Sequence, residues 1–167
     1  RLVMHDTLKN LLKINENVKT NILSNKNLSV SPKIIAVSKT FKIDHIRPLI
    51  DYGHLDYGEN KVQEAYEKWN NIKIENNNIK LHLIGRLQTN KVKIAVKLFD
   101  YIHSLDSKKL ADKISEQQKE HDLNVKLFIQ VNIGEELQKS GIHEYELIDF
   151  YKYCKSLNLN IIGLMCI

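Results

Sequence analysis

Residues 34–39 read Ile-Ile-Ala-Val-Ser-Lys, an apolar run that ends on the primary amine of Lys39. The run predicts a buried strand over residues 33–39, of the kind found in parallel sheets. In α/β folds, ligands bind at the edge formed by the carboxyl ends of the strands. Apolar neighbours can desolvate an amine there, which lowers its pKa and suits it to imine formation. The alternative is a lysine that simply reaches solvent, as most lysines do.

Strands and helices alternate along the rest of the chain. A helical pattern covers residues 5–24, and a helix is expected after each completed strand, with Asp44 as the cap of the first of these and Gly53 at its end. Further strands are predicted at residues 54–57, 80–84, 101–105, 125–133 and 160–167. This alternation is typical of a parallel sheet, either a doubly wound open sheet or a (β/α)₈ barrel. The chain stops inside an apolar strand, which favours a barrel cut short after six βα units.

The composition is that of one globular domain over residues 1–167. Hydrophobic residues make up 43% of the chain and charged residues 27%, and no apolar stretch approaches the length of a membrane span. The net charge of +5 comes from lysines interleaved with acidic residues, so we expect a phosphate-bearing small molecule as partner and no nucleic acid. The Asn-rich tract at residues 70–78 is expected to be a loose surface insertion.

Cysteine and histidine usage argues against a metal centre. The chain has two cysteines, Cys154 and Cys166, and seven scattered histidines that form no i, i+4 pair. Two cysteines so far apart are neither a zinc site nor a disulfide framework. We therefore expect two buried thiols in a reducing cytoplasm and no bound metal.

Polar residues follow each predicted strand and should meet at one edge of the sheet. Lys39 follows the first strand, Asn60 the second and Arg86 the third. Such convergence is the layout of a site at the carboxyl face of a barrel.

These strand ends, taken together, resemble the pyridoxal phosphate homeostasis protein family, whose fold is an alanine racemase type (β/α)₈ barrel. The matching pieces are residues 36–39 (Ala-Val-Ser-Lys), 58–64 (Gly-Glu-Asn-Lys-Val-Gln-Glu), 82–91 (His-Leu-Ile-Gly-Arg-Leu-Gln-Thr-Asn-Lys), 103–106 (His-Ser-Leu-Asp), 130–132 (Gln-Val-Asn), 139–141 (Lys-Ser-Gly) and 163–165 (Gly-Leu-Met). Each piece alone is weak, but all occur in order. In this family, two further strands carry segments that hold the phosphate, and the chain ends before both. The expectation is therefore an incomplete barrel.

The resemblance implies that Lys39 holds pyridoxal 5'-phosphate as a Schiff base. It also suggests that Asn60 binds the cofactor or orients the lysine, unless Asn60 only caps the following helix. His82 either lies under the cofactor ring or is a core histidine with satisfied hydrogen bonds. Arg86 and Lys91 are expected to attract an anion at the mouth of the site, unless both are merely solvated. Lys139 is expected to face solvent.

The function implied by the resemblance is a non-catalytic carrier of pyridoxal 5'-phosphate in the cytoplasm. We expect a monomer that supplies the cofactor to apoenzymes. The alternative is a cofactor-dependent amino-acid racemase or lyase, which needs a second acid–base group across the ring from Lys39. A cofactor-free aldolase using a Schiff-base lysine and an RNA-binding module are the other possibilities.

Overall fold

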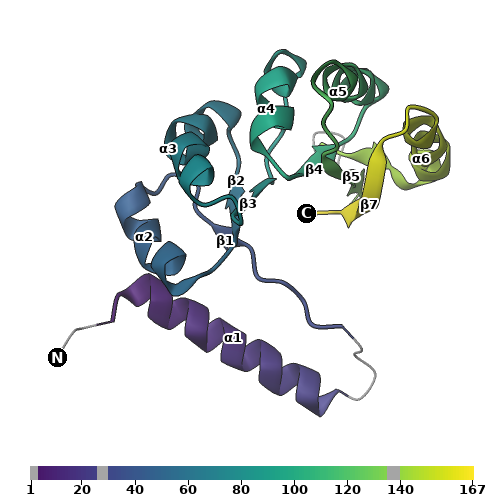
Figure 1. The fold of residues 1–167 in the computed structure, drawn as a ribbon. Helices are drawn as coiled ribbons and strands as arrows, with labels where there is room; N and C mark the ends of the chain where they lie inside the picture. Colours follow the sequence, from purple (N-terminus) through teal and green to yellow (C-terminus); the bar gives the residue numbers. More distant parts are fainter. Residues whose placement is uncertain (1–3, 26–29, 135–139) are drawn as a thin grey trace.

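The computed structural model describes residues 4–25, 30–134 and 140–167, so the prediction for Lys139 lies outside the described residues. The described part of the chain forms one parallel sheet with helices along it (Figure 1). The helices are α1 (Asp6–Ser24), α2 (Ile43–Tyr52), α3 (Val62–Glu75), α4 (Val92–Leu98), α5 (Lys108–His121) and α6 (Leu147–Ser156), with short 3₁₀ turns at η1 (Thr89–Lys91) and η2 (Glu144–Glu146). The strands are β1 (Ala36–Val37), β2 (Asp56–Glu59), β3 (Lys80–Leu83), β4 (Tyr101–Leu105), β5 (Lys126–Asn132), β6 (Ile142–His143) and β7 (Asn160–Met165).

Neighbouring strands follow one another in the chain. The sheet order is β1-β2-β3-β4-β5-β6, and β7 also pairs with β5. All these pairings are parallel. Among the described residues, β1 pairs only with β2 and β7 only with β5, so the sheet is an open arc. The predicted α/β fold and its six main strands are confirmed, whereas the two-residue β6 was not predicted.

Helices α2 to α6 follow one another along one side of the arc of strands (Figure 1). Helix α1 lies outside this row and packs against α2. Strand residues on that side alternate with residues on the inner side, as the pleat requires. Tyr57 of β2 faces the helices and packs on Trp69 of α3, with ring centroids 4.7 Å apart. The largest fully buried side chains include Trp69, Tyr57, Leu81, Leu83, Ile102 and Ile114. The core therefore lies between the sheet and its helices.

Several local predictions hold and others need correction. Gly53 ends α2 with a φ of 96°, and Ser107 caps α5 by accepting a hydrogen bond from Leu110 N at 3.2 Å. Asp44 does not cap α2, because Lys42 occupies the cap position. Asp44 instead lies in the first turn, where a carboxylate still interacts favourably with the helix dipole.

The Asn-rich tract is not a loose insertion. Its first six residues, 70–75, continue α3. Ile72 in the tract and Ile79 directly after it are buried in the core. Helical spacing of apolar residues thus outweighs the low helix propensity of asparagine here.

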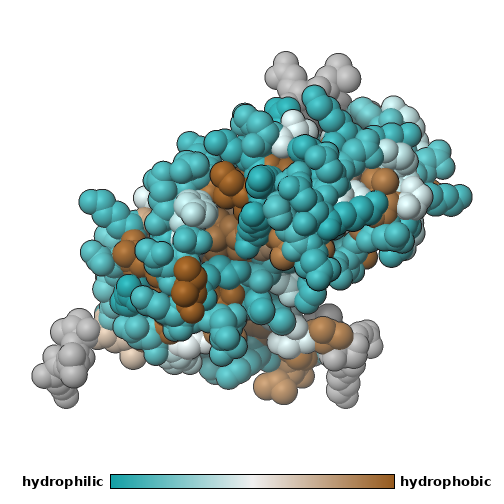
Figure 2. Space-filling model, turned by 45° about the horizontal axis from the view of Figure 1, so that its top comes forward, coloured by the Kyte–Doolittle hydropathy of each residue, from teal (hydrophilic) through white to brown (hydrophobic). Residues whose placement is uncertain are grey.

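Among the described residues, no helix has the length and apolar character needed to cross a membrane. The face shown in Figure 2 is mainly hydrophilic, with apolar side chains in small separate groups.

Candidate functional site at the carboxyl edge of the sheet

Lys39 and Asn60 leave neighbouring strands at the same level. Val37 pairs with Gly58, and each site residue lies two positions further along its strand. Ser38 and Glu59, at the intervening positions, hydrogen-bond to each other and face α3. By the alternation of the pleat, Lys39 and Asn60 therefore belong to the inner face of the sheet. The structure brings these two predicted residues together at the carboxyl edge.

Lys39 lies in a tight turn immediately after β1. The N–H of Phe41 donates to the carbonyl oxygen of Ser38 at 3.2 Å, which closes the turn around Lys39 and Thr40. Thr40 has a φ of 67°, in the left-handed region. Lys39 is exposed, and its Nζ makes no hydrogen bond or ion pair with the described residues. The partial burial expected from its apolar neighbours is wrong for this structure, because Val37 beside it is also half exposed.

The backbone of Asn60 lies very close to Gly85, at a position where a side chain would not fit. A Cβ atom on Gly85 would lie 2.3 Å from the carbonyl oxygen of Asn60 and 2.8 Å from its Cβ. Only glycine allows the ends of β2 and β3 to approach so closely. The side-chain Oδ1 of Asn60 is buried and has no hydrogen-bond partner among the described residues. An unused amide oxygen thus lies at the same edge as Lys39.

His82 lies one layer below these residues, on the same face. It pairs with Gly58 across the β2–β3 ladder and is 5% exposed. Its Nε2 lies 2.9 Å from Asp56 Oδ1, and its Nδ1 lies 2.9 Å from Nε2 of His103 on β4. The rings of His82 and Tyr101 stack with centroids 4.3 Å apart. His82 therefore belongs to a hydrogen-bonded network that links β2, β3 and β4.

Burial keeps both histidines of this network neutral. Burial lowers the pKa of His82, although the neighbouring Asp56 carboxylate opposes the shift. For His103, burial and the proximity of His82 lower the pKa to about 4. Because a carboxylate only accepts hydrogen bonds, the Nε2–H of His82 donates to Asp56, and its Nδ1 accepts from Nε2–H of His103. We assign these tautomers from the network, and the contact with Asp56 is then a hydrogen bond of a neutral ring.

Arg86 and Lys91 lie further along the segment that follows β3. Arg86 is exposed and makes no hydrogen bond or ion pair with the described residues, while Lys91 is half-buried at the end of η1. An unpaired guanidinium beyond the end of β3 leaves a positive charge available to an anion.

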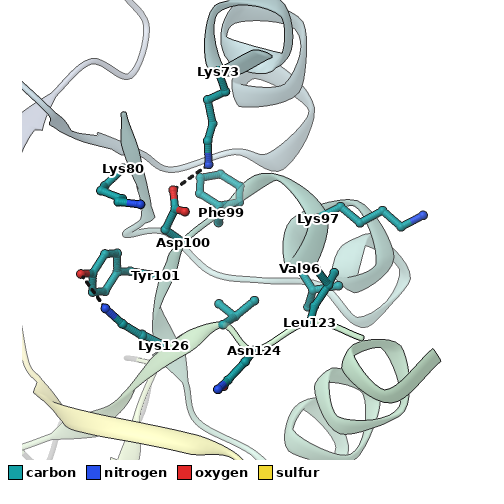
Figure 3. A pocket seen from close by; sticks show the side chains of 11 residues that line it. Lys73, Lys80, Val96, Lys97, Phe99, Asp100, Tyr101, Leu123, Asn124 and Lys126 are labelled. Carbon is teal, nitrogen blue, oxygen red and sulfur yellow. Dashed lines mark hydrogen bonds and ion pairs between the residues drawn. The ribbon is translucent and has the colours of Figure 1, made fainter. Parts of the chain in front are cut away.

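A cavity of about 240 Å³ lies at the opposite edge of the sheet (Figure 3). Lys73 Nζ lies 2.6 Å from Asp100 Oδ2, which also accepts the N–H of Leu81 at 2.8 Å. This ion pair ties α3 to the amino ends of β3 and β4. Parallel α/β sheets bind ligands at the carboxyl edge, and the cavity includes none of the predicted site residues. The candidate site is therefore the edge that carries Lys39.

Asp56 and His103 were not identified as network residues from the sequence. The available signal was that Asp56, His82 and His103 lie in three consecutive predicted strands. Their contact depends on the register between those strands, which strand prediction alone does not supply.

Comparison with known proteins places the chain among characterised families. The model of the alanine racemase N-terminal domain matches residues 14–167. The pyridoxal phosphate homeostasis protein of Pasteurella multocida is 36% identical over 160 residues, covering 95% of this chain and 69% of the relative. Its namesake in Haemophilus influenzae is 38% identical over 136 residues, covering 81% of this chain and 57% of the relative.

A solved structure extends this similarity to the backbone. PipY of Synechococcus elongatus PCC7942, with PLP bound, superposes with a TM-score of 0.75 at 34% identity, covering 90% of this chain and 69% of PipY. The chain thus spans between 57% and 69% of the length of these three proteins. Sequence identity and backbone similarity each extend over most of this chain.

Proposed function

Because this chain belongs to the pyridoxal phosphate homeostasis protein family and matches the model of the alanine racemase N-terminal domain, we propose that it binds pyridoxal 5'-phosphate on Lys39. The observation that carries the proposal is an exposed, unpaired primary amine at the carboxyl edge of a parallel sheet, within a family motif. When bound, the cofactor would supply an aldehyde, and the Lys39 amine would be the group that condenses with it, releasing one water.

The residues around Lys39 fit such a ligand. Asn60 offers an amide oxygen that no described residue uses, and Arg86 offers a guanidinium suited to phosphate. Ile35 and Ile84 meet over Gly58, where an added Cβ would lie 3.2 and 3.3 Å from them. Their side chains supply an apolar surface for a flat ring. We assign His82 to the layer of the inner face beneath this apolar surface, where it is hydrogen-bonded to Asp56 and His103.

We propose a carrier rather than an enzyme, because the relatives are named as homeostasis proteins. On this proposal the chain acts as one cofactor-binding domain and as a cytoplasmic monomer, and it passes the cofactor to apoenzymes. The competing function is a racemase or lyase. The neutral pair of His82 and His103 on the Lys39 face favours it, since neutral imidazoles transfer protons. Turnover of alanine or serine isomers by the loaded protein would support the enzyme and contradict the carrier.

The proposal is tested by locating the modified residue. The purified chain is mixed with pyridoxal 5'-phosphate, its visible absorption is recorded, and the adduct is reduced with borohydride and mapped by peptide mass. We expect modification confined to Lys39. The Lys39→Ala variant should lose the visible band while keeping the wild-type melting temperature, because a strand end tolerates the loss of a solvated amine.

Lys42→Ala is the matched control. Lys42 is an exposed lysine three positions further along, and its replacement should leave the band intact. Labelling spread over many lysines, or an unchanged band in Lys39→Ala, would contradict the assignment.

A further inference from the structure

The segment that carries Lys39 is held by side chains more than by the sheet. The ladder between β1 and β2 consists of two residue pairs. Beyond it, one backbone hydrogen bond joins Ser38 N to Gly58 O at 2.9 Å. A ladder this short constrains the position of Lys39 weakly.

Ser38, immediately before Lys39, is tied at two atoms. Its Oγ donates to Glu59 Oε1 at 2.8 Å, and its carbonyl oxygen accepts from Lys68 Nζ at 2.7 Å. Glu59 is fully buried, and the same Oε1 also accepts from Lys68 Nζ and from Trp69 Nε1, each at 2.8 Å. A charged pair inside the core therefore holds the residue before the lysine.

Thr40, immediately after Lys39, is tied by the same group of side chains. Its N–H donates to Glu64 Oε1 at 2.6 Å. That bond is the main reason why the pKa of Glu64 is lowered, and the neighbouring Lys68 lowers it further. Lys68 Nζ also donates to Glu64 Oε1 at 3.3 Å. All three hydrogens of the ammonium are then matched by Ser38 O, Glu59 and Glu64.

We propose that Glu59, Glu64 and Lys68 are positioning residues for Lys39, and we call them the clamp. They fix the backbone on both sides of the lysine, so that the Lys39 side chain extends from one defined position on the inner face. None of the three takes part in the chemistry directly, because their hydrogen bonds with the described residues lie on the helix side of the strand. The consequence for cofactor binding rests on the proposed function, whereas the role of these residues in fixing the turn around Lys39 and Thr40 does not.

Glu64 offers the cleanest test, because it is only half-buried and the pair of Glu59 and Lys68 survives its removal. The first readout needs no cofactor and is amide hydrogen exchange at Thr40, followed by NMR. In Glu64→Ala we expect exchange at this amide to become about tenfold faster or more, while core amides keep their wild-type rates. Glu64→Gln keeps an acceptor oxygen and should stay closer to wild type.

Glu67→Ala is the matched control. Glu67 lies on the same helix and carries the same charge, and the only hydrogen-bond partner of its side chain among the described residues is Gln63. Its replacement should leave exchange at Thr40 unchanged. Unchanged exchange at Thr40 in Glu64→Ala would overturn the clamp, as would an equal rise in both variants.

The second readout is the rate at which Lys39 reacts with pyridoxal 5'-phosphate. We expect Glu64→Ala to slow it by about tenfold, because a displaced backbone misplaces the amine, with Glu64→Gln restoring most of the loss. If wild type labels Lys39 and Glu64→Ala labels it at the same rate, the clamp has no positioning role. If wild type does not label Lys39 at all, the proposed function fails, and the exchange experiment still decides whether the clamp holds the turn.

Discussion

Thr40 is the residue in this structure whose backbone conformation is hardest to explain from its side chain. A β-branched residue in the left-handed region places its Cβ against its own carbonyl group, which costs about 1–2 kcal/mol. The hydrogen bond from its N–H to Glu64 offsets part of this cost. Strain of this kind tends to persist where surrounding contacts enforce it, and functional sites are such places.

The strain at Thr40 can be measured by substitution. Thr40→Gly removes the Cβ and should raise the free energy of unfolding by about 1 kcal/mol, after allowing for the greater freedom of glycine in the unfolded chain. Thr40→Ala keeps a Cβ and should show no comparable gain. Chemical denaturation of both variants gives the comparison. Equal stability of the alanine and glycine variants would show that the turn is not strained.

At this scale, the sequence was informative about which residues lie at one edge of the sheet and silent about their partners. Lys39 and Asn60 could be placed at one edge, because both follow apolar runs. The contact between Thr40 and Glu64 spans a strand and a helix start, so no local pattern reveals it. The pairing of Glu64 with Lys68 at i, i+4 on a helix was the one local signal for the clamp.

Strands β2, β3 and β4 are joined by the network of Asp56, His82 and His103, which makes their stability depend on pH. Burial keeps His103 neutral in the folded protein, with a pKa of about 4, whereas an unfolded histidine titrates near 6.5. Between these values the unfolded chain binds the extra proton. The contribution of the neutral His103 to the free energy of unfolding is therefore fully present above about pH 6.5 and is lost as the pH drops toward 4.

We expect the free energy of unfolding to fall by up to about 3 kcal/mol across this window, from His103 alone. Urea denaturation at a series of pH values measures the slope. His103→Gln removes the titrating ring and should flatten it, whereas His45→Gln, at an exposed position on α2, should keep the wild-type slope. A slope in His103→Gln as steep as that of wild type would contradict the role given to this histidine.

The existence of most elements could be predicted, but their ends could not. The apolar run at residues 33–39 predicts seven strand residues, whereas only Ala36 and Val37 pair with β2. A run of apolar residues indicates burial, and pairing also needs a partner in register. Residues 70–75 show the reverse case, in which asparagines suggested a loop and the burial of Ile72 kept the helix intact.

At the scale of the whole molecule, the two cysteines report on unfolding. Cys154 is fully buried in α6, as expected, and burial raises the pKa of its thiol to about 11. The burial expected of Cys166 is wrong, because this residue lies just beyond the end of β7 and is exposed. A thiol reagent near neutral pH should therefore modify Cys166 rapidly. Cys154 should react at least about a hundredfold more slowly, at a rate set by opening of the core.

Counting modified thiols over time tests this expectation. In Cys166→Ser the fast reaction should disappear, and denaturant should accelerate the remaining one in step with unfolding. Two fast thiols in the native protein would mean that α6 does not pack as described.

The order of strands in the sheet also bears on how the molecule is assembled. Partners across each ladder from β1 to β4 are only about twenty residues apart in the chain, and the entropic cost of closing such segments is similar for each. Short, evenly spaced contacts favour growth of the sheet outward from an interior pair of strands. We expect β1 to add last on its side, since it has one neighbouring strand and two paired residues in the described part of the chain. During refolding, Lys39 would thus be among the last residues to become ordered, after the inner face beneath it has formed.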